Sequence, residues 1–132
     1  MTDVAVMKLE DFESADAPDV PAGLFRYAGK SLGVQAWGMN VLTLPPGWER
    51  YPEHDHADDG HEEVYVVLRG TATLHVGQEQ CALGTGMFAR VGPSERRRIV
   101  PGPEGVVFLA LGGTPGKPYA PSWGRAAKES PR

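Results

Sequence analysis

The chain has 132 residues, which is enough for one domain with a core and too few for two ordinary domains. Its formal net charge of −4 leaves no basic footprint, so nucleic acid is not an expected partner. The sequence contains no run of roughly 20 apolar residues, as a membrane helix needs, and no signal peptide at its start. A single cysteine, Cys81, cannot form an internal disulfide. Together these features predict a soluble, cytoplasmic protein that does not associate with membranes.

Residues 1–20 predict a polar, acidic arm, in which Val4, Val6 and Leu9 alternate imperfectly and indicate an edge strand. From residue 21 to 113, glycines and prolines divide the chain into short apolar runs, which predicts antiparallel β structure with tight turns. The expected strands are 24–28, 34–44, 64–68, 71–76, 79–83, 87–91, 97–100 and 106–111.

Turns or breaks are expected between these strands, above all at Gly29–Ser31, at Arg69–Gly70 and at Pro101–Pro103. The remaining residues, 114–132, predict a Gly/Pro-rich tail that lies over the surface with Tyr119 and Trp123 as anchors. Many short strands at close spacing are typical of a small sandwich or barrel.

The most informative stretch runs from Gly47 to Gly70 and contains His54 and His56, two residues apart, followed by Glu63 at the start of an apolar run. Side chains two residues apart in a strand lie on the same face, so both imidazoles are expected to point the same way. A turn at residues 57–60 would bring Glu63 to the same point. Two neutral imidazoles and a carboxylate suit non-haem iron and other first-row divalent metals. Without Glu63 in this register, the two histidines would be surface residues of an acidic loop.

This stretch resembles the first motif of the cupin family: a glycine, a His-X-His pair, a glutamate, six residues and another glycine. The residues that fit are Gly47, His54, His56, Glu63 and Gly70, with a longer loop between His56 and Glu63 than is usual. The second motif, a glycine and a proline-containing turn before a histidine, resembles the region from Gly86 through Gly92-Pro93-Ser94. The resemblance covers residues 34–112. It implies a single-domain, all-β double-stranded β-helix, or jelly-roll barrel, with a cavity for a small ligand.

The family's second motif implies a fourth ligand histidine, but the aligned residue in this chain is Arg97. Arg97 shares strand parity with apolar Ile99, so we expect its side chain to point inward. A guanidinium is cationic and has no acceptor lone pair, so it cannot bind a metal.

Three interpretations of the site follow, and the sequence leaves them open. In the first, His54, His56 and Glu63 alone hold the metal, and Arg97 binds the carboxylate of an anionic substrate. In the second, His61, which has the same parity as Glu63, replaces the missing ligand. In the third, no metal binds and Arg97 pairs with Glu63, because a buried carboxylate needs a partner.

Two functions are therefore predicted. The first is a cupin that binds a divalent metal (Fe, Mn, Ni or Zn) and a small, anionic molecule, as an oxygenase or an isomerase. Arg97 and Tyr65 are its expected substrate-binding residues. The second is a non-catalytic cupin that binds or senses a small molecule and has a metal-free site. The resemblance also implies that two copies pair through edge strands as a homodimer. The sequence does not identify catalytic residues, the substrate or the reaction.

Overall fold

The structure is a computed structural model and describes residues 2–120. Residues 121–132, which include Trp123 and most of the predicted tail, lie outside the described residues. No helix within residues 2–120 is long and apolar enough to cross a membrane.

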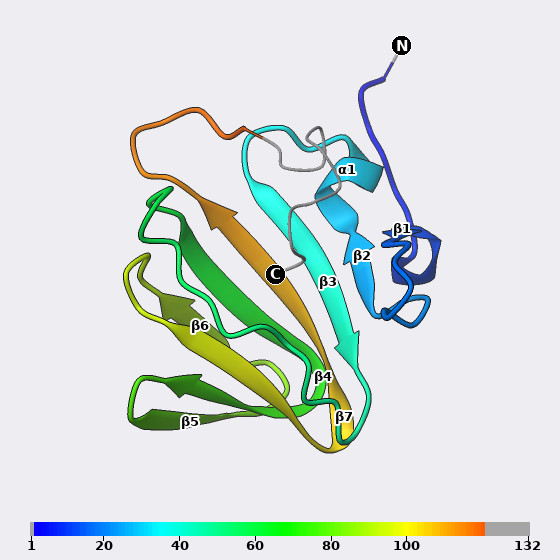
Figure 1. Cartoon of the computed structure of the whole chain (residues 1–132). Helices are drawn as coiled ribbons and strands as arrows, with labels where there is room; N and C mark the ends of the chain where they lie inside the picture. Colours follow the sequence, from blue (N-terminus) through cyan, green and yellow to red (C-terminus); the bar gives the residue numbers. More distant parts are fainter. Residues whose placement is uncertain (1, 121–132) are drawn as a thin grey trace.

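Seven strands within the described residues form one antiparallel sheet in the order β1-β2-β3-β7-β4-β5, with β6 also paired to β4 (Figure 1). The strands are β1 (Glu13–Ser14), β2 (Phe25–Tyr27), β3 (Gly38–Leu44), β4 (Glu62–Val76), β5 (Glu79–Leu83), β6 (Phe88–Val91) and β7 (Arg97–Gly113). The predicted all-β, single-domain fold is confirmed.

Two long strands, β4 and β7, replace four of the short strands that the sequence predicts. They pair with each other from Glu62↔Gly113 to Val76↔Arg97. The predicted tight turn at Arg69–Gly70 is wrong, because β4 continues through it, and so is the predicted break at Pro101–Pro103, because β7 continues as well. The pairing register shifts at both places, so the residues that break the ladder form bulges rather than strand ends.

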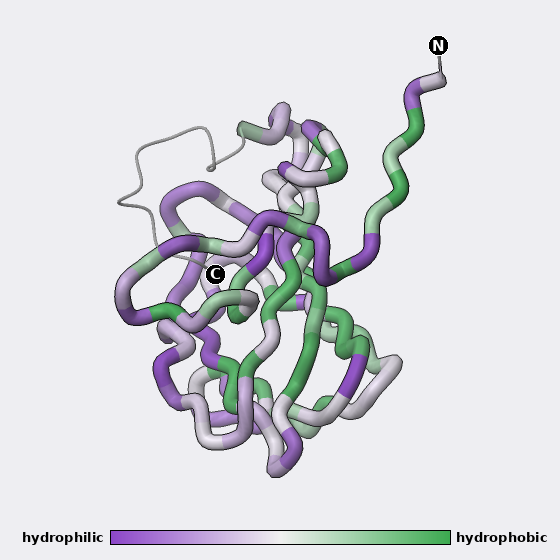
Figure 2. The backbone as a smooth tube through the Cα atoms, turned by 90° about the vertical axis from the view of Figure 1, so that its right-hand side faces the viewer, coloured by the Kyte–Doolittle hydropathy of each residue, from purple (hydrophilic) through white to green (hydrophobic). Residues whose placement is uncertain are grey.

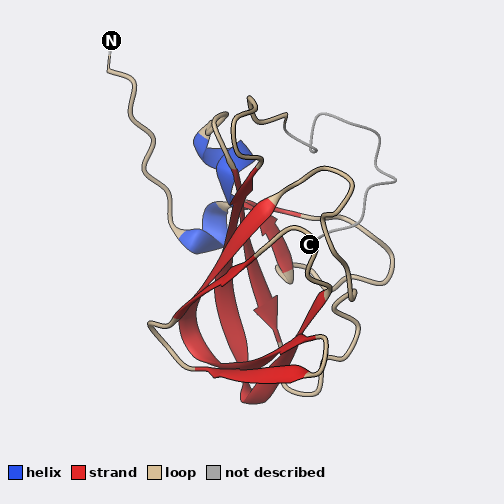
Figure 3. Ribbon diagram, turned by 90° about the vertical axis from the view of Figure 1, so that its left-hand side faces the viewer, coloured by secondary structure: helices blue, strands red, loops and turns tan. Residues whose placement is uncertain are grey.

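The bulges let the sheet fold over into two layers, as the curved strands in Figure 3 show. The first part of β4 lies between β7 and β6, and its last part lies between β7 and β5. Side chains that point inward from both layers form the main core, and Tyr65, Phe108 and Ile99 are almost completely buried there. The site described below lies within this interior.

The N-terminal region differs from its prediction in two ways. Val4 and Val6 do not form an edge strand but are exposed, Leu9 begins a short 3-10 helix (Leu9–Asp11), and the edge strand is β1. The predicted turn at Gly29–Ser31 is part of a five-residue helix, α1 (Ala28–Leu32), which ends at Gly33 with φ +83°. Such a helix is too short to produce an apolar period in the sequence, and only its terminal glycine signals it. The strand expected to begin at residue 34 begins at Gly38.

Candidate metal centre

Glu63 reaches the interior because it is the second residue of β4 and alternates with outward-facing Val64. Its side chain is fully buried. It pairs with Val91 of β6 on one side and with Gly112 of β7 on the other, so its backbone is fixed in the middle of the sheet. The predicted inward direction of Glu63 therefore follows from strand parity alone.

The two histidines come from a loop rather than from a regular strand. His54 forms an isolated bridge with Arg97, through a backbone hydrogen bond in each direction of 3.0 and 2.8 Å. The backbone N–H of His56 donates to the carbonyl of Pro93 at 2.8 Å. The expected turn at residues 57–60 is present and is closed by a hydrogen bond from Gly60 N–H to the carbonyl of His56. The histidines are thus held against the chain next to Arg97, in the layer opposite Glu63.

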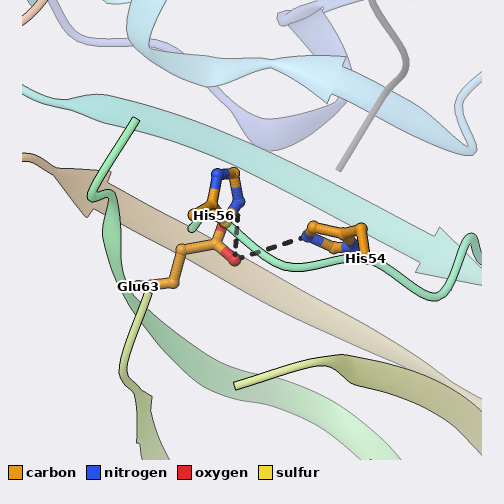
Figure 4. A group of neighbouring side chains, drawn as sticks. All are labelled: His54, His56 and Glu63. Carbon is orange, nitrogen blue, oxygen red and sulfur yellow. Dashed lines mark ion pairs between the residues drawn. The ribbon is translucent and has the colours of Figure 1, made fainter. Parts of the chain in front are cut away.

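The three side chains meet at one oxygen of Glu63 (Figure 4). Oε1 of Glu63 lies 3.7 Å from Nε2 of His54 and 3.5 Å from Nε2 of His56. Candidate ligand atoms from all three residues lie within 4.8 Å of one another. Within the described chain, the Nε2 atoms of His54 and His56 are buried and have no hydrogen-bond partner. Their role as metal ligands stays a prediction.

The other ring nitrogen of each histidine fixes the position of its proton. Nδ1 of His54 lies 3.0 Å from the carbonyl oxygen of Pro52, and Nδ1 of His56 lies 3.2 Å from both carboxylate oxygens of Asp59. A carbonyl and a carboxylate can only accept, so each neutral ring carries its proton on Nδ1. The lone pair of each ring is then on Nε2, which faces Glu63.

His61 and Asp59 form a second group that shares His56. Asp59 contacts Nδ1 of His61 at 3.3 Å as well as Nδ1 of His56, and the backbone N–H of His61 donates to it at 2.9 Å. His61 is buried, but it belongs to the group of His56 and Asp59 rather than to that of His54 and Glu63. The structure thus places one of the four predicted ligands beside the main group, not in it.

Asp59 is the residue that reasoning from the sequence missed. Partial burial acts to raise the pKa of Asp59. Hydrogen bonds from the backbone N–H of His61 and from the rings of His56 and His61, together with the charge of His56, outweigh this effect and lower the pKa below its usual value. Asp59 is therefore an anion that holds two imidazoles. Its spacing, three residues after His56 and two before His61, was the only available signal, and it is common in acidic turns.

Arg97 points inward as expected and is completely buried. Its Nη1 donates to Oε1 of Glu63 at 2.7 Å. Its Nη2 donates to the carbonyl of Gly92 at 2.6 Å, and its Nε donates to the carbonyl of Glu95 at 2.8 Å. The pairing of Arg97 with Glu63 in the third interpretation is therefore present. A direct contact between Arg97 and a substrate stays a prediction.

Tyr65 is also fully buried, two residues after Glu63 on the same face of β4. Its hydroxyl donates to Oε1 of Glu63 at 2.7 Å and lies 3.4 Å from the hydroxyl of Tyr51. Burial, with the neighbouring Tyr51 and Glu63, raises the pKa of Tyr65 well above its usual value, so the phenol remains a neutral donor. Its contact with a substrate stays a prediction.

A separate cavity of about 540 Å³ lies against β4, β5 and β6. Gly92 and Glu95, whose carbonyls accept hydrogen bonds from Arg97, contribute to its lining, whereas His54, His56 and Glu63 do not. Arg97 thus contacts both the carboxylate of the histidine site and the wall of this cavity.

The donor set fits a divalent transition metal. Two Nε2 atoms with their lone pairs directed inward, each with Nδ1 bound to an acceptor, have the arrangement of metal-binding histidines with oriented rings. A carboxylate beside them suits iron, manganese, nickel or zinc. Buried ring nitrogens without a hydrogen bond are costly in a protein, and a bound ion would satisfy them.

Solved structures with the same fold support the arrangement of the strands. A cupin protein from Bacteroides fragilis is 19% identical, with a TM-score of 0.63 over 94% of this chain and 100% of that one. An uncharacterized conserved protein with a double-stranded β-helix domain from Klebsiella pneumoniae is 19% identical, with a TM-score of 0.65 over 86% and 92% of the two chains. A sugar phosphate isomerase of the cupin superfamily from Silicibacter pomeroyi is 19% identical, with a TM-score of 0.66 over 82% and 74%.

At these identities the likeness shows the fold alone. A comparison with curated proteins gives no match. The family model described as "Cupin domain" matches residues 40–112, which is more than half of the chain and contains both histidines, Glu63 and Arg97. The double-stranded β-helix, the matched segment and the inward-facing His/Glu group agree with one another, and the chain belongs to the cupin family.

Proposed function

We propose that the protein binds one divalent transition metal ion at His54, His56 and Glu63, and a small anionic molecule beside it. The observation that carries this proposal is the convergence of two buried Nε2 atoms without hydrogen bonds on Oε1 of Glu63. Both rings are already oriented by acceptors at Nδ1, so the chain holds the ligands in place before an ion arrives.

The charges around the site support an anionic ligand. The guanidinium of Arg97 already neutralises the carboxylate of Glu63. A divalent ion would therefore bring uncompensated positive charge into a buried space, offset only in part by Asp59. An anion at the remaining coordination positions would reduce that charge.

Three protein ligands leave coordination positions open for such a molecule. A bound ion would supply Lewis acidity or an oxygen-activating centre, which is the chemistry that an isomerase or an oxygenase needs. Tyr65 would contribute a neutral O–H at Oε1 of Glu63, and Arg97 would hold that carboxylate in position from the opposite layer.

The first experiment measures metal content by elemental analysis of the purified protein, after equilibration with Fe, Mn, Ni or Zn and gel filtration. We expect about one ion per chain in the wild type. The double variant His54→Ala/His56→Ala should lose the ion. The matched control His75→Ala, which changes the only histidine outside the loop, should keep it. A wild-type protein that takes up none of these metals would exclude the metal site.

The second experiment tests the anion. Co²⁺ bound at a His/carboxylate site absorbs visible light, and the spectrum depends on its ligands. We expect malonate to change the spectrum of the Co²⁺-loaded wild type in a saturable manner. An unchanged spectrum up to high malonate concentration would contradict the proposed anionic ligand, but not the proposed metal site.

The ion pair between Arg97 and Glu63 favours a second candidate, a metal-free cupin that binds or senses a small molecule. In this case Arg97 provides the positive charge that a metal would otherwise bring to the buried carboxylate. This candidate predicts a metal-free wild type and a His54→Ala/His56→Ala variant of unchanged stability. The elemental analysis therefore separates the two functions.

A further inference from the structure

His56 has a carboxylate on each side of its ring. Its Nε2 lies 3.5 Å from Oε1 of Glu63, and its Nδ1 lies 3.2 Å from both carboxylate oxygens of Asp59. A second imidazole stands beside each carboxylate. Nε2 of His54 lies 3.7 Å from the same oxygen of Glu63, and Nδ1 of His61 lies 3.3 Å from Oδ2 of Asp59. The same set of groups, two imidazole nitrogens and a carboxylate, therefore occurs on both sides of His56.

The separations in the outer set, which consists of His56, Asp59 and His61, suit the ligands of one ion. In a tetrahedral site with metal–ligand bonds of about 2.0–2.1 Å, neighbouring ligand atoms are roughly 3.3–3.4 Å apart. The Nδ1 atoms of His56 and His61 lie 3.2 and 3.3 Å from the nearest oxygens of Asp59. These distances are longer than the roughly 2.9 Å that is usual for an N–H···O hydrogen bond. The candidate ligand atoms of the outer set all lie within 4.8 Å of one another.

The turn that carries the outer set is fastened to the barrel and faces solvent on one side. Oγ1 of Thr114 donates to the backbone carbonyl of Asp59 at 2.9 Å. Residues 53–63 are almost entirely hydrophilic (Figure 2), yet His56 and His61 are only 8% and 6% exposed. The side chain of Asp59, in contrast, is 52% exposed. The outer set is therefore held from the inside and is reached from solvent at its carboxylate.

We propose that His56, Asp59 and His61 form a second divalent-metal site, and that His56 bridges it to the first. The bridge rests on the function proposed above, in which His56 binds the first ion through Nε2. The second ion binds Nδ1 of His56 and of His61, and the protons that these two atoms carry are released to solvent. His56 is then an imidazolate with one ring nitrogen on each ion. Its negative charge lies between the two cations and offsets part of their repulsion.

The second ion is held more weakly than the first. Its binding removes the last ring proton of His56 and places a second positive charge near the first. Its carboxylate ligand, Asp59, is half-exposed, whereas Glu63 is fully buried. Imidazole and carboxylate ligands suit Zn²⁺ and Cu²⁺, and the affinity for Cu²⁺ is the higher of the two.

The first experiment counts bound ions at equilibrium, by dialysis of the purified protein against increasing Zn²⁺ and elemental analysis on both sides of the membrane. We expect the wild type to bind two ions per chain, of which gel filtration removes the weaker one. His61→Asn keeps an N–H donor for Asp59 but has no imidazole nitrogen, so it should lose the second ion and keep the first. The matched control His75→Asn, outside the loop, should bind two ions.

The number of ions separates this proposal from the function on which it rests. A wild type that saturates at one ion would overturn the second site and leave the first, and a wild type that binds none would overturn both. A folded His61→Asn variant that still binds two ions would place the second ion elsewhere and overturn the proposal. The circular dichroism spectrum of His61→Asn shows whether that variant is folded.

The second experiment tests the bridge in the wild type and needs no variant. The unpaired electrons of two Cu²⁺ ions that share an imidazolate couple antiferromagnetically, whereas those of two distant ions do not. We expect the electron paramagnetic resonance signal to grow until one Cu²⁺ is bound per chain, and to fall below that level when the second binds. A signal that grows to two equivalents would show two separate ions and overturn the shared role of His56.

Discussion

Oε1 of Glu63 accepts hydrogen bonds from Arg97 and Tyr65 and lies close to two imidazoles, so four side chains depend on one buried carboxylate oxygen. Of the four side chains around this oxygen, Arg97 is the one that carries a full positive charge. It also donates to two backbone carbonyls, which makes it a structural link between the turn after β6 and the interior of the barrel. A buried pair of this kind is weak as a source of stability, yet loss of one partner leaves the other charge without compensation.

We therefore expect Arg97→Met to destabilise the metal-free protein by about 3–5 kcal/mol, because the carboxylate of Glu63 stays buried without a cation. The measurement is urea unfolding in the presence of a chelator. The control is Arg96→Met, which removes the neighbouring arginine, whose side chain is 59% exposed. The control should cost less than about 1 kcal/mol. Equal effects of the two substitutions would contradict the role given to Arg97.

Asp59 acts on the same site from outside it, through the Nδ1 atoms of His56 and His61. Asp59→Asn keeps an oxygen that can accept from the backbone N–H of His61, but it loses the charge and one of the acceptor oxygens. We expect metal affinity to fall by roughly 10- to 100-fold, measured by calorimetric titration. Asp58→Asn, an exposed substitution in the same turn, should leave the affinity unchanged. If both variants bind metal as the wild type does, Asp59 does not orient the ligands.

Strand parity explains which of the site residues the sequence could place. Glu63 and Arg97 each alternate with outward-facing residues and lie two residues from a buried side chain, so their direction follows from the period of a strand. The period does not show that Arg97 would reach Glu63, because the two lie in different layers. Asp59 has no such period to reveal it, since its role depends on the shape of a turn. The tautomers of the histidines are equally invisible in a sequence.

At the scale of elements, the glycines and prolines mark turns and irregularities in the strands, but not all of them mark strand ends. Gly77 does end β4, as expected of a turn residue, whereas Gly70 lies inside β4 at a bulge. Both positions have positive φ angles, which favour glycine, so a glycine alone does not tell a bulge inside a strand from a turn at its end. The difference is tertiary, because β4 at Gly70 still has β7 beside it to continue the ladder. This is why the number of strands was overestimated while the fold class was right.

The same comparison gives a prediction for Gly70→Ala. A Cβ at Gly70 would lie 2.2 Å from the carbonyl oxygen of Gly105, and the φ angle of +80° is itself unfavourable for alanine. We expect a loss of about 2–5 kcal/mol in the free energy of unfolding, since strain and overpacking both act. Gly77→Ala meets nothing within 4 Å and should cost only about 1–2 kcal/mol. Thermal or urea unfolding of the two variants measures the difference, and a similar loss in both would show that the close approach to Gly105 is relieved cheaply.

At the scale of the whole molecule, the site contains residues from both layers of the folded sheet. Glu63 comes from the layer that contains β6, whereas His54 and Arg97 lie together in the other one. An ion held by residues of both layers cannot bind a chain in which the layers have separated. Binding of the proposed ion would therefore be coupled to the folding of the whole domain rather than to local order in one loop.

This coupling predicts how stability depends on metal concentration. At a free metal concentration of about 100 times the dissociation constant, the native state gains about 2.7 kcal/mol, which for a domain of this size raises the melting temperature by on the order of 10 °C. Calorimetric melting of the wild type with Zn²⁺ and with a chelator measures the shift. His75→Ala should show the same shift, and His54→Ala/His56→Ala should show none. A shift that survives in the double variant would mean that the ion stabilises the fold elsewhere, because neither of the two proposed histidine ligands would then remain to link the layers.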